Sequence, residues 1–256
     1  MNPTNVLIAS ITSYESVNEE RFKLAVKMAE EATKAGYTVI LVDDSPTEVW
    51  GKLKEAGAHV YRCSEKGMGF ARRESVKKAE RYLHINHPGE QGVIIMTEPE
   101  KSDIIRFIPE IIEEILKGNS DIVIPMRSEK SWKSYPWFQE EIEKVDNFVY
   151  SQTTGIRADP MFGPVAFHSD VAPYFKNCKP STYGVSDNYI QHIAPIEACR
   201  EGKRICAVEI DFIYPPEQKA EEEGTKFSET AKKRLWQQKQ LVETYFKVGK
   251  ALQLTV

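Results

Sequence analysis

The chain has 256 residues, of which 41% are hydrophobic and 28% are charged, so it is long enough for one sizeable core and near the upper limit of a single domain. Its formal net charge of -4 argues against a protein that wraps nucleic acid, because phosphate binding on that scale needs an excess of Lys and Arg. The four cysteines form no CxxC pair, which predicts reduced thiols and no structural zinc site. There is neither a signal-peptide pattern nor an apolar run near the ~20 residues of a membrane span, so we expect a cytoplasmic protein.

The first half of the chain alternates short apolar runs with segments of helical periodicity. We predict strands and helices at regular intervals: strands at 6–11, 37–42, 58–63, 92–96 and 121–125, and helices at about 18–35, 47–56, 70–83 and 104–117. Gly36 is a natural stop for the first helix, and the run after it lacks polar alternation, as a strand buried on both faces does. Successive strand–helix–strand units of this kind predict an α/β fold with a mostly parallel sheet flanked by helices.

The second half is less regular, and we predict that it continues the same domain, which then covers residues 1–256. We divide this single domain into a first half at 5–125, a second half at 126–215 and a C-terminal segment at 216–256. Residues 126–150 are rich in aromatic side chains and show no clear period. Packing in the core is the favoured role for most of these aromatics, and stacking on a bound ligand is the alternative.

The C-terminal segment divides into a charged stretch and a helix. Residues 217–226 are predicted to form a mobile loop, and a helix is predicted at about 228–252 with apolar side chains at helical spacing. Packing back on the domain is the favoured role of this helix. The alternatives are that it caps a groove or mediates self-association as a homo-oligomer.

Polar clusters follow the predicted strands of the first half. Ligands bind outside the carboxyl ends of the strands in an open α/β sheet, so these clusters are the candidate site. They are Thr12, Ser13 and Tyr14 after the first strand, Asp43, Asp44 and Ser45 after the second, 66–73 after the third, and 97–100 after the fourth.

Glu98 and Glu100 are the sharpest signal among these clusters. Two carboxylates separated by one residue at a strand end can share a hard divalent cation, Mg²⁺ or Mn²⁺, with a diphosphate. The alternative is that both are solvated loop residues. Pro99 between them rigidifies the turn.

The third cluster combines basic residues with glycines at the start of a helix. Lys66, Arg72 and Arg73, with Gly67 and Gly69 permitting close backbone approach, suit phosphate binding near a helix N-terminus. A solvated basic face is the alternative. The motif lacks the third glycine of a dinucleotide fingerprint and follows the third strand, which argues against a Rossmann dehydrogenase.

Two further residues have both a functional and a structural interpretation. Asp187 precedes a predicted helix at 189–201, so it is either a general base or, with Ser186, a helix N-cap. His168 is a candidate ligand for metal or phosphate, although a lone histidine at a strand end is more often structural.

The order of these clusters resembles the GT-A fold glycosyltransferases, particularly the large inverting family that includes polyprenyl-phosphate mannosyltransferases. In that family a short loop after the first strand contacts the nucleotide, and an acid after the second strand contacts the base. The glycine-containing stretch with Ala71-Arg72 and the segment around Gly163 occupy further places in the family's order. The resemblance covers residues 5–215 and implies a GT-A fold.

The chain departs from the family pattern at two motifs. Glu98-Pro99-Glu100 stands where the family has Asp-x-Asp, and Ser186 replaces the usual Glu before the catalytic Asp187. These departures leave open the loss of metal dependence or of activity.

The resemblance implies transfer of a sugar with inversion from a nucleotide-diphosphate donor, a UDP- or GDP-sugar, to a hydroxyl acceptor. The acceptor is a sugar, a lipid-linked molecule or a small molecule. In this mechanism Thr12 and Asp44 seat the nucleotide, Glu98 and Glu100 hold the metal, and Asp187 deprotonates the acceptor. Two alternatives are a nucleotidyltransferase, disfavoured because no Gly- and Arg-rich loop follows the first strand, and a nucleotide-binding protein without turnover.

Overall fold

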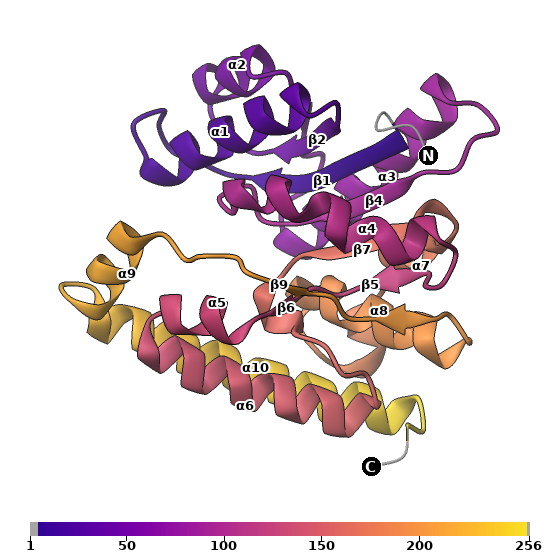
Figure 1. The fold of residues 1–256 in the computed structure, drawn as a ribbon, viewed down its shortest axis with the longest axis vertical. Coiled ribbons are helices and arrows are strands. Elements are labelled where there is room, and N and C mark those ends of the chain that lie inside the picture. Colours follow the sequence, from indigo (N-terminus) through magenta and orange to yellow (C-terminus); the bar gives the residue numbers. More distant parts are fainter. Residues whose placement is uncertain (1–4, 255–256) are drawn as a thin grey trace.

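The computed structural model describes residues 5–254, which form an α/β fold around one seven-stranded sheet (Figure 1). The strand order is β3-β2-β1-β4-β7-β5-β8, and every neighbouring pair is parallel except the two pairs made by β7. The strands are β1 (Val6–Thr12), β2 (Thr38–Asp43), β3 (His59–Arg62), β4 (Val93–Met96), β5 (Ile122–Val123), β7 (Val165–His168) and β8 (Ile205–Cys206). The predicted mostly parallel sheet is confirmed.

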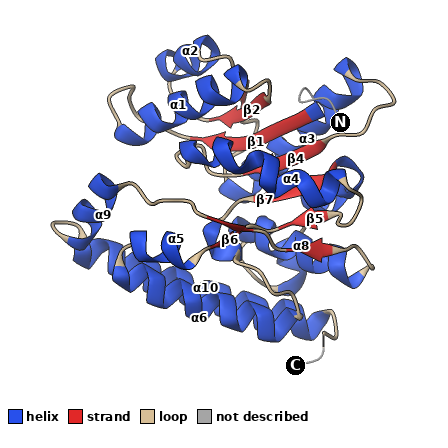
Figure 2. Ribbon diagram, viewed as in Figure 1, coloured by secondary structure: helices blue, strands red, loops and turns tan. Residues whose placement is uncertain are grey.

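Helices cover both faces of the sheet (Figure 2). Alternate residues of β1 point to opposite faces, so Ile8 packs in one core cluster and Leu7 in the other. The first cluster is covered by α1 (Glu20–Lys34), α2 (Thr47–Glu55) and α4 (Ile108–Leu116), and the second by α3 (Met68–Asn86), α7 (Ala172–Asn177) and α8 (Ile190–Arg200). Because both faces are covered, β2 is apolar without alternation, as predicted.

The C-terminal helix α10 (Phe227–Ala251) packs back on the domain, as favoured from the sequence. It runs in the same direction as α6 (Trp137–Thr154), and the two helices lie side by side (Figure 1). At one end the rings of Trp137 and Phe227 stack with centroids 6.1 Å apart, and farther along Tyr150 meets Tyr245 at 5.1 Å. Residues 126–150, for which no element was predicted, therefore owe much of their order to a helix far away in the sequence.

A buried ion network joins α6 to the small two-stranded sheet of β6 (Met126–Arg127) and β9 (Glu209–Ile210). The fully buried Arg127 guanidinium donates to Asp159 through Nε at 2.6 Å and to Glu143 through Nη1 at 2.6 Å. Arg234 of α10 donates to the other oxygen of Glu143 at 3.1 Å. The charges of this network compensate one another, which is the condition for ions to be buried at all.

Three segments differ from the sequence prediction. The charged stretch predicted as a mobile loop forms a helix, α9 (Pro216–Glu223), which begins at a proline and is tied to Tyr214 and Trp137 by its last glutamates. The helix predicted at 104–117 is split into a 3₁₀ turn, η2 (Ser102–Phe107), and α4, because Pro109 has no N–H to donate to the carbonyl of Ile105, which interrupts the α-helical hydrogen bonds there. Likewise, Pro125 separates the short β5 from β6.

The remaining short turns are 3₁₀: η3 (Pro160–Phe162), η4 (Ser169–Val171), η5 (Pro180–Tyr183) and η6 (Asp187–Tyr189). Within residues 5–254, no helix has the length and apolarity needed to cross a bilayer. The four cysteines are free thiols, as predicted.

Candidate functional site

A cavity of about 130 Å³ opens at the carboxyl ends of β1 and β4. The chain leaves β1 toward β2 on one side, while β4 pairs with β1 on the other side, so this edge is the point where the strand order reverses. Such a switch point is the general position of ligand sites in open α/β sheets. The polar side chains that line the cavity include Arg21 of α1, Arg72 of α3, Gln191 of α8, and Glu98 and Glu100 of the loop after β4.

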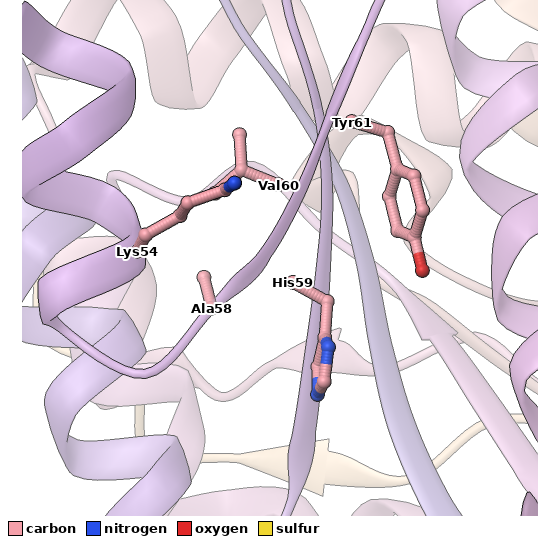
Figure 3. A pocket seen from close by; sticks show the side chains of 5 residues that line it. All are labelled: Lys54, Ala58, His59, Val60 and Tyr61. Carbon is pink, nitrogen blue, oxygen red and sulfur yellow. The ribbon is translucent and has the colours of Figure 1, made fainter.

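A larger hollow of about 350 Å³ lies along the edge strand β3 and is lined by residues 54 and 58–61. Figure 3 shows that His59 and Tyr61 lie on one side of the strand and Lys54, Ala58 and Val60 on the other. Side chains on opposite faces of a strand do not converge on one ligand. The smaller cavity at the switch point is therefore the candidate site.

The ends of β1 and β2 are locked together by Asp43. Its carboxylate is completely buried and accepts hydrogen bonds from the Thr12 hydroxyl at 2.7 Å and the Ser45 hydroxyl at 2.6 Å. All of these contacts are internal to the chain, so Thr12 and Asp43 shape the site edge. Ser13 and Asp44 are exposed beside them, and Ser13 lines the cavity.

Glu100 lies between the first loop and the first helix. Its Oε1 accepts a hydrogen bond from the Tyr14 hydroxyl at 3.1 Å and from Arg21 Nη2 at 2.5 Å. Burial and the nearby Glu100 carboxylate raise the pKa of Tyr14 well above its usual value, so this hydroxyl stays a donor. The Arg21 side chain is 64% exposed, which leaves much of its guanidinium open to the cavity.

Glu98 is held between two cationic side chains. Lys101 Nζ lies 2.8 Å from its Oε2, and Arg72 Nη2 lies 3.9 Å from its Oε1. Burial opposes ionisation of this carboxyl, but the charges of Lys101 and Arg72 outweigh burial and lower its pKa to about 2. Burial also lowers the pKa of Arg72, against the opposing effect of Glu98, but an arginine stays charged at neutral pH.

Gly163 makes room for Glu98. A β-carbon on Gly163 would lie 2.5 Å from Glu98 Oε2, and the glycine has φ +101°, which L side chains rarely adopt. The antiparallel register of β4 with β7 places Met96 opposite Val165, so the next pair out along the strands on the same face joins Glu98 to Gly163. The predicted segment around Gly163 therefore reaches the same site as the Glu98 pair.

The N-terminus of α3 forms the rim of the site. Gly67 is its N-cap, and Lys66 and Gly67 are exposed to solvent. Gly69 in the first turn allows η6 to approach, because a β-carbon there would lie 1.9 Å from the backbone oxygen of Asp187. No acidic residue occupies this first turn, so the free backbone N–H groups there suit an anion.

Asp187 lies on this rim and is 46% exposed. Arg73 donates to both of its oxygens, Nη1 to Oδ1 at 2.6 Å and Nη2 to Oδ2 at 2.7 Å. The N-cap of η6 is Ser186, whose hydroxyl accepts from the Asn188 N–H at 3.4 Å. The predicted role of helix N-cap therefore belongs to Ser186. The Asp187 side chain caps none of the described helices and pairs with Arg73 instead.

The residues present do not fit a divalent cation between Glu98 and Glu100 as they stand. Lys101 and Arg21 already contact these carboxylates at 2.8 and 2.5 Å, so a metal would have to displace positively charged groups from both. In residues 5–254, no three His, Cys, Asp or Glu side chains gather where they could hold a metal. His168 ends β7 at the opposite edge of the sheet, where it pairs in register with Val93.

The sequence did not identify three residues of the site: Arg21, Lys101 and Gln191. Arg21 lies in the first turn of α1, and a helix that follows a parallel strand begins at the carboxyl edge, so its position was accessible to sequence reasoning. Gln191 lines the cavity, is 9% exposed, and has a buried Oε1 without a hydrogen-bond partner among the described residues. Such an unpaired acceptor suits a ligand that brings a donor.

No model of a known protein family matches the sequence, and no curated protein matches it. The structure is similar to crystal structures of glucosyl-3-phosphoglycerate synthase from Mycobacterium tuberculosis. The complex with Mn²⁺, UDP and phosphoglyceric acid has a TM-score of 0.52 at 11% identity, over 92% of this chain and 78% of that chain. The complex with Mn²⁺, UDP-glucose and phosphoglyceric acid has a TM-score of 0.51 at 12% identity, over 90% and 79%.

These matches extend over nearly all of the described chain, and at such low identity they show the fold alone. The synthase shares the arrangement of sheet and helices, so the GT-A resemblance inferred from the order of the clusters is confirmed at the level of architecture. The chain has a GT-A-like α/β fold, with a mostly parallel sheet flanked by helices and a long C-terminal helix.

Proposed function

We propose that this protein is a glycosyltransferase that moves a sugar from a nucleotide-diphosphate donor, a UDP- or GDP-sugar, to a hydroxyl acceptor. The observation that carries the proposal is the cavity at the switch point, which joins cationic side chains, an unpaired amide oxygen and an exposed carboxylate on its rim. Arginines suit a diphosphate, and the Gln191 amide suits a sugar hydroxyl. The fold is shared with an enzyme whose crystals contain UDP-glucose.

In the proposed reaction the acceptor oxygen attacks the anomeric carbon, and the bond from that carbon to the diphosphate oxygen breaks. Asp187 accepts the proton of the acceptor hydroxyl as the new bond forms, and the nucleoside diphosphate leaves with the bonding electrons. One displacement of this kind inverts the anomeric carbon. No step is assigned to Mg²⁺ or Mn²⁺, because the carboxylates expected to bind it already contact cationic side chains.

The roles of the other predicted residues follow from their positions. Ser13, Tyr14 and Asp44 are proposed to border the nucleotide, while Thr12 and Asp43 hold that edge of the sheet rigid. Lys66, with the backbone of Gly67 and Gly69, is proposed to face the phosphates from the start of α3.

A second candidate is a nucleotide-binding protein without turnover. One observation favours it: Arg73 engages both oxygens of Asp187, so a proton can be accepted only when one of these hydrogen bonds opens. An acceptor that binds first and displaces Arg73 from Asp187 would free the carboxylate to accept a proton, and the geometry would then be compatible with catalysis.

The test is a ligand screen followed by a turnover assay on the purified protein. Thermal unfolding is measured with UDP, GDP, CDP and ADP, since a ligand that binds only the native state raises the apparent stability. The matching nucleotide-sugars are then incubated with candidate acceptors, and release of nucleoside diphosphate is measured. A thermal shift with acceptor-dependent release supports the glycosyltransferase. A shift without release supports the second candidate, and no shift with any nucleotide contradicts both.

A further inference from the structure

The glycosyltransferases that this fold resembles hold a divalent cation at the strand end where this chain has Glu98-Pro99-Glu100. In this chain, cationic side chains already contact both glutamates at that strand end. Glu98 contacts Lys101 and Arg72, and Glu100 contacts Arg21. The five groups carry three positive and two negative charges, so the site has a net charge of about +1 before any ligand enters.

We infer that Arg21 and Arg72 take the place of the metal: they bind the diphosphate of the donor directly, and nucleotide binding needs no divalent cation. The inference rests on the proposed function, since it concerns the same donor. Lys101 does not line the cavity; it approaches Glu98 from outside and compensates that carboxylate. Because Lys101 compensates Glu98, the positive charge of Arg72 is available to an anionic ligand.

The two arginines are held for this role by different means. Arg72 is anchored by Nη1, which donates to the backbone oxygen of Asn188, while its Nη2 is the atom near Glu98. Arg21 is steadied by Glu100 and lies over the Tyr14 ring at 5.7 Å. Guanidinium groups bind phosphate oxygens in pairs of hydrogen bonds, so two positioned arginines can hold a diphosphate without a metal.

The two glutamates then have a different task from metal ligands. They position and neutralise the guanidinium groups while the site is empty, and they repel the diphosphate when it enters. A metal site predicts that removal of one carboxylate weakens nucleotide binding. The arginine site predicts that removal of the Glu98 charge leaves nucleotide affinity unchanged or increases it, because a like charge is removed.

The experiment is calorimetric titration of the folded protein with the nucleoside diphosphate found in the thermal screen, once in excess EDTA and once with Mn²⁺. We expect the two dissociation constants to agree within about threefold. Arg21→Gln, an exposed position that should not disturb folding, is expected to weaken binding in EDTA by about tenfold or more, as loss of a charged hydrogen bond does. Arg72→Met is the second variant, and Glu98→Gln is expected to bind at least as tightly as the parent protein.

Arg204→Gln is the matched control for Arg21→Gln, because Arg204 makes a comparable exposed arginine–carboxylate pair with Asp121, outside the cavity. Its nucleotide affinity is expected to equal that of the parent. Binding that requires Mn²⁺ overturns the inference and leaves the proposed function intact. Binding in EDTA that neither arginine variant weakens also overturns it, and so does a Glu98→Gln variant that loses affinity. Absence of binding in both buffers contradicts the proposed function, and the inference falls with it.

Discussion

Arg73 and Asp187 form a two-fold hydrogen-bonded ion pair across the rim of the cavity, with both nitrogen–oxygen distances at 2.6 to 2.7 Å. The pair joins the first turns of α3 to η6, two segments 114 residues apart in the sequence. The pair fixes the orientation of the Asp187 carboxylate, which lies beside the cavity and which we assign as the base. Its importance can be tested through Asp187 without disturbing the core, since this side chain is exposed.

Asp187→Asn removes the proposed base and keeps the shape of the side chain. Sugar transfer is expected to fall by about 10²- to 10⁴-fold, the usual contribution of a general base, because an amide cannot accept the acceptor proton. Nucleotide affinity is expected to stay the same, since Asp187 does not line the cavity. The measurements are initial rates of nucleoside diphosphate release and calorimetric binding.

Asp121→Asn is the control for that variant. Asp121 also forms a two-fold pair with an arginine, Arg204, but at the start of β5 on the opposite edge of the sheet. The transfer rate of this control is expected to match that of the parent protein. Equal losses in the two variants would show that the effect is structural, and an Asp187→Asn enzyme with full activity would exclude this residue as the base.

Gln191→Leu removes a buried amide whose oxygen has no partner in the described chain. We expect the free energy of unfolding to stay equal or to increase, because an unsatisfied polar group is replaced by an apolar one of similar size. Affinity for the nucleotide-sugar is expected to fall, while affinity for the nucleoside diphosphate alone is unchanged, because the amide is proposed to meet the sugar. Calorimetric titration with both ligands separates the two effects.

The matched control is Gln139→Leu in α6, which also removes a buried glutamine with an unpartnered Oε1. Gln139 donates to Glu143 at 2.8 Å and lies outside the cavity, so this variant is expected to lose stability and keep its ligand affinity. If Gln191→Leu bound the nucleotide-sugar as tightly as the parent, the amide would have no part in donor recognition.

Gly163→Ala tests the close approach of β7 to Glu98. The new methyl group would lie 2.5 Å from Glu98 Oε2, so the carboxylate must shift from its present position between Lys101 and Arg72. Nucleotide affinity is therefore expected to change measurably, together with a stability loss of about 1 kcal/mol or more from the positive φ. Gly202→Ala has a similar φ of +83° with open space around it, so it should show the stability loss without the change in binding.

Asp146 gives a pH dependence of stability that can be measured without any ligand. Its carboxyl is fully buried, and burial first and then the Glu143 charge raise its pKa from 3.8 to about 7, against a smaller effect of Gln238. The folded state therefore binds this proton more tightly than the unfolded state. Stability from this group is present below pH 4 and is lost as the pH rises toward 7.

Asp146→Asn keeps the shape of the side chain and removes the titration. At pH 8 the variant is expected to be more stable than the parent by about 2 to 4 kcal/mol, since each pKa unit corresponds to ~1.4 kcal/mol. This gap should shrink toward pH 4. Urea unfolding of both proteins across this range measures it, with the surface variant Asp103→Asn as a control that should show no such trend. A gap independent of pH would mean that Asp146 ionises normally.

The sequence predicts the first half of this fold well because its determinants are local. Each buried strand ends in a polar cluster, and parallel strands bring these ends to one edge, so Arg72 and Glu98 were expected in one site, and both line the cavity. The order of the clusters also identified the GT-A architecture. Hydrophobic periodicity carries this information, since it depends on residues near one another in the chain.

The partners of the charged side chains could not be predicted in the same way. Arg21 reaches Glu100 across 79 residues, and Arg73 reaches Asp187 across 114. Such pairs depend on how helices are placed over the sheet, which composition and spacing do not encode. The sequence therefore indicated a pair of acids suited to a metal and missed the cations that already contact them.

The reversed strand β7 has a consequence for how the two halves of the chain can diverge. Because it runs against its neighbours, its first residues meet the ends of β4, and its last residue, His168, leaves at the far edge. Insertions after His168 would lengthen only loops remote from the cavity. A single residue inserted between Gly163 and Val165 would instead shift that junction by ~3.3 Å. The four residues of β7 thus set the spacing between the two halves of the chain, tolerant of change at one end and intolerant at the other.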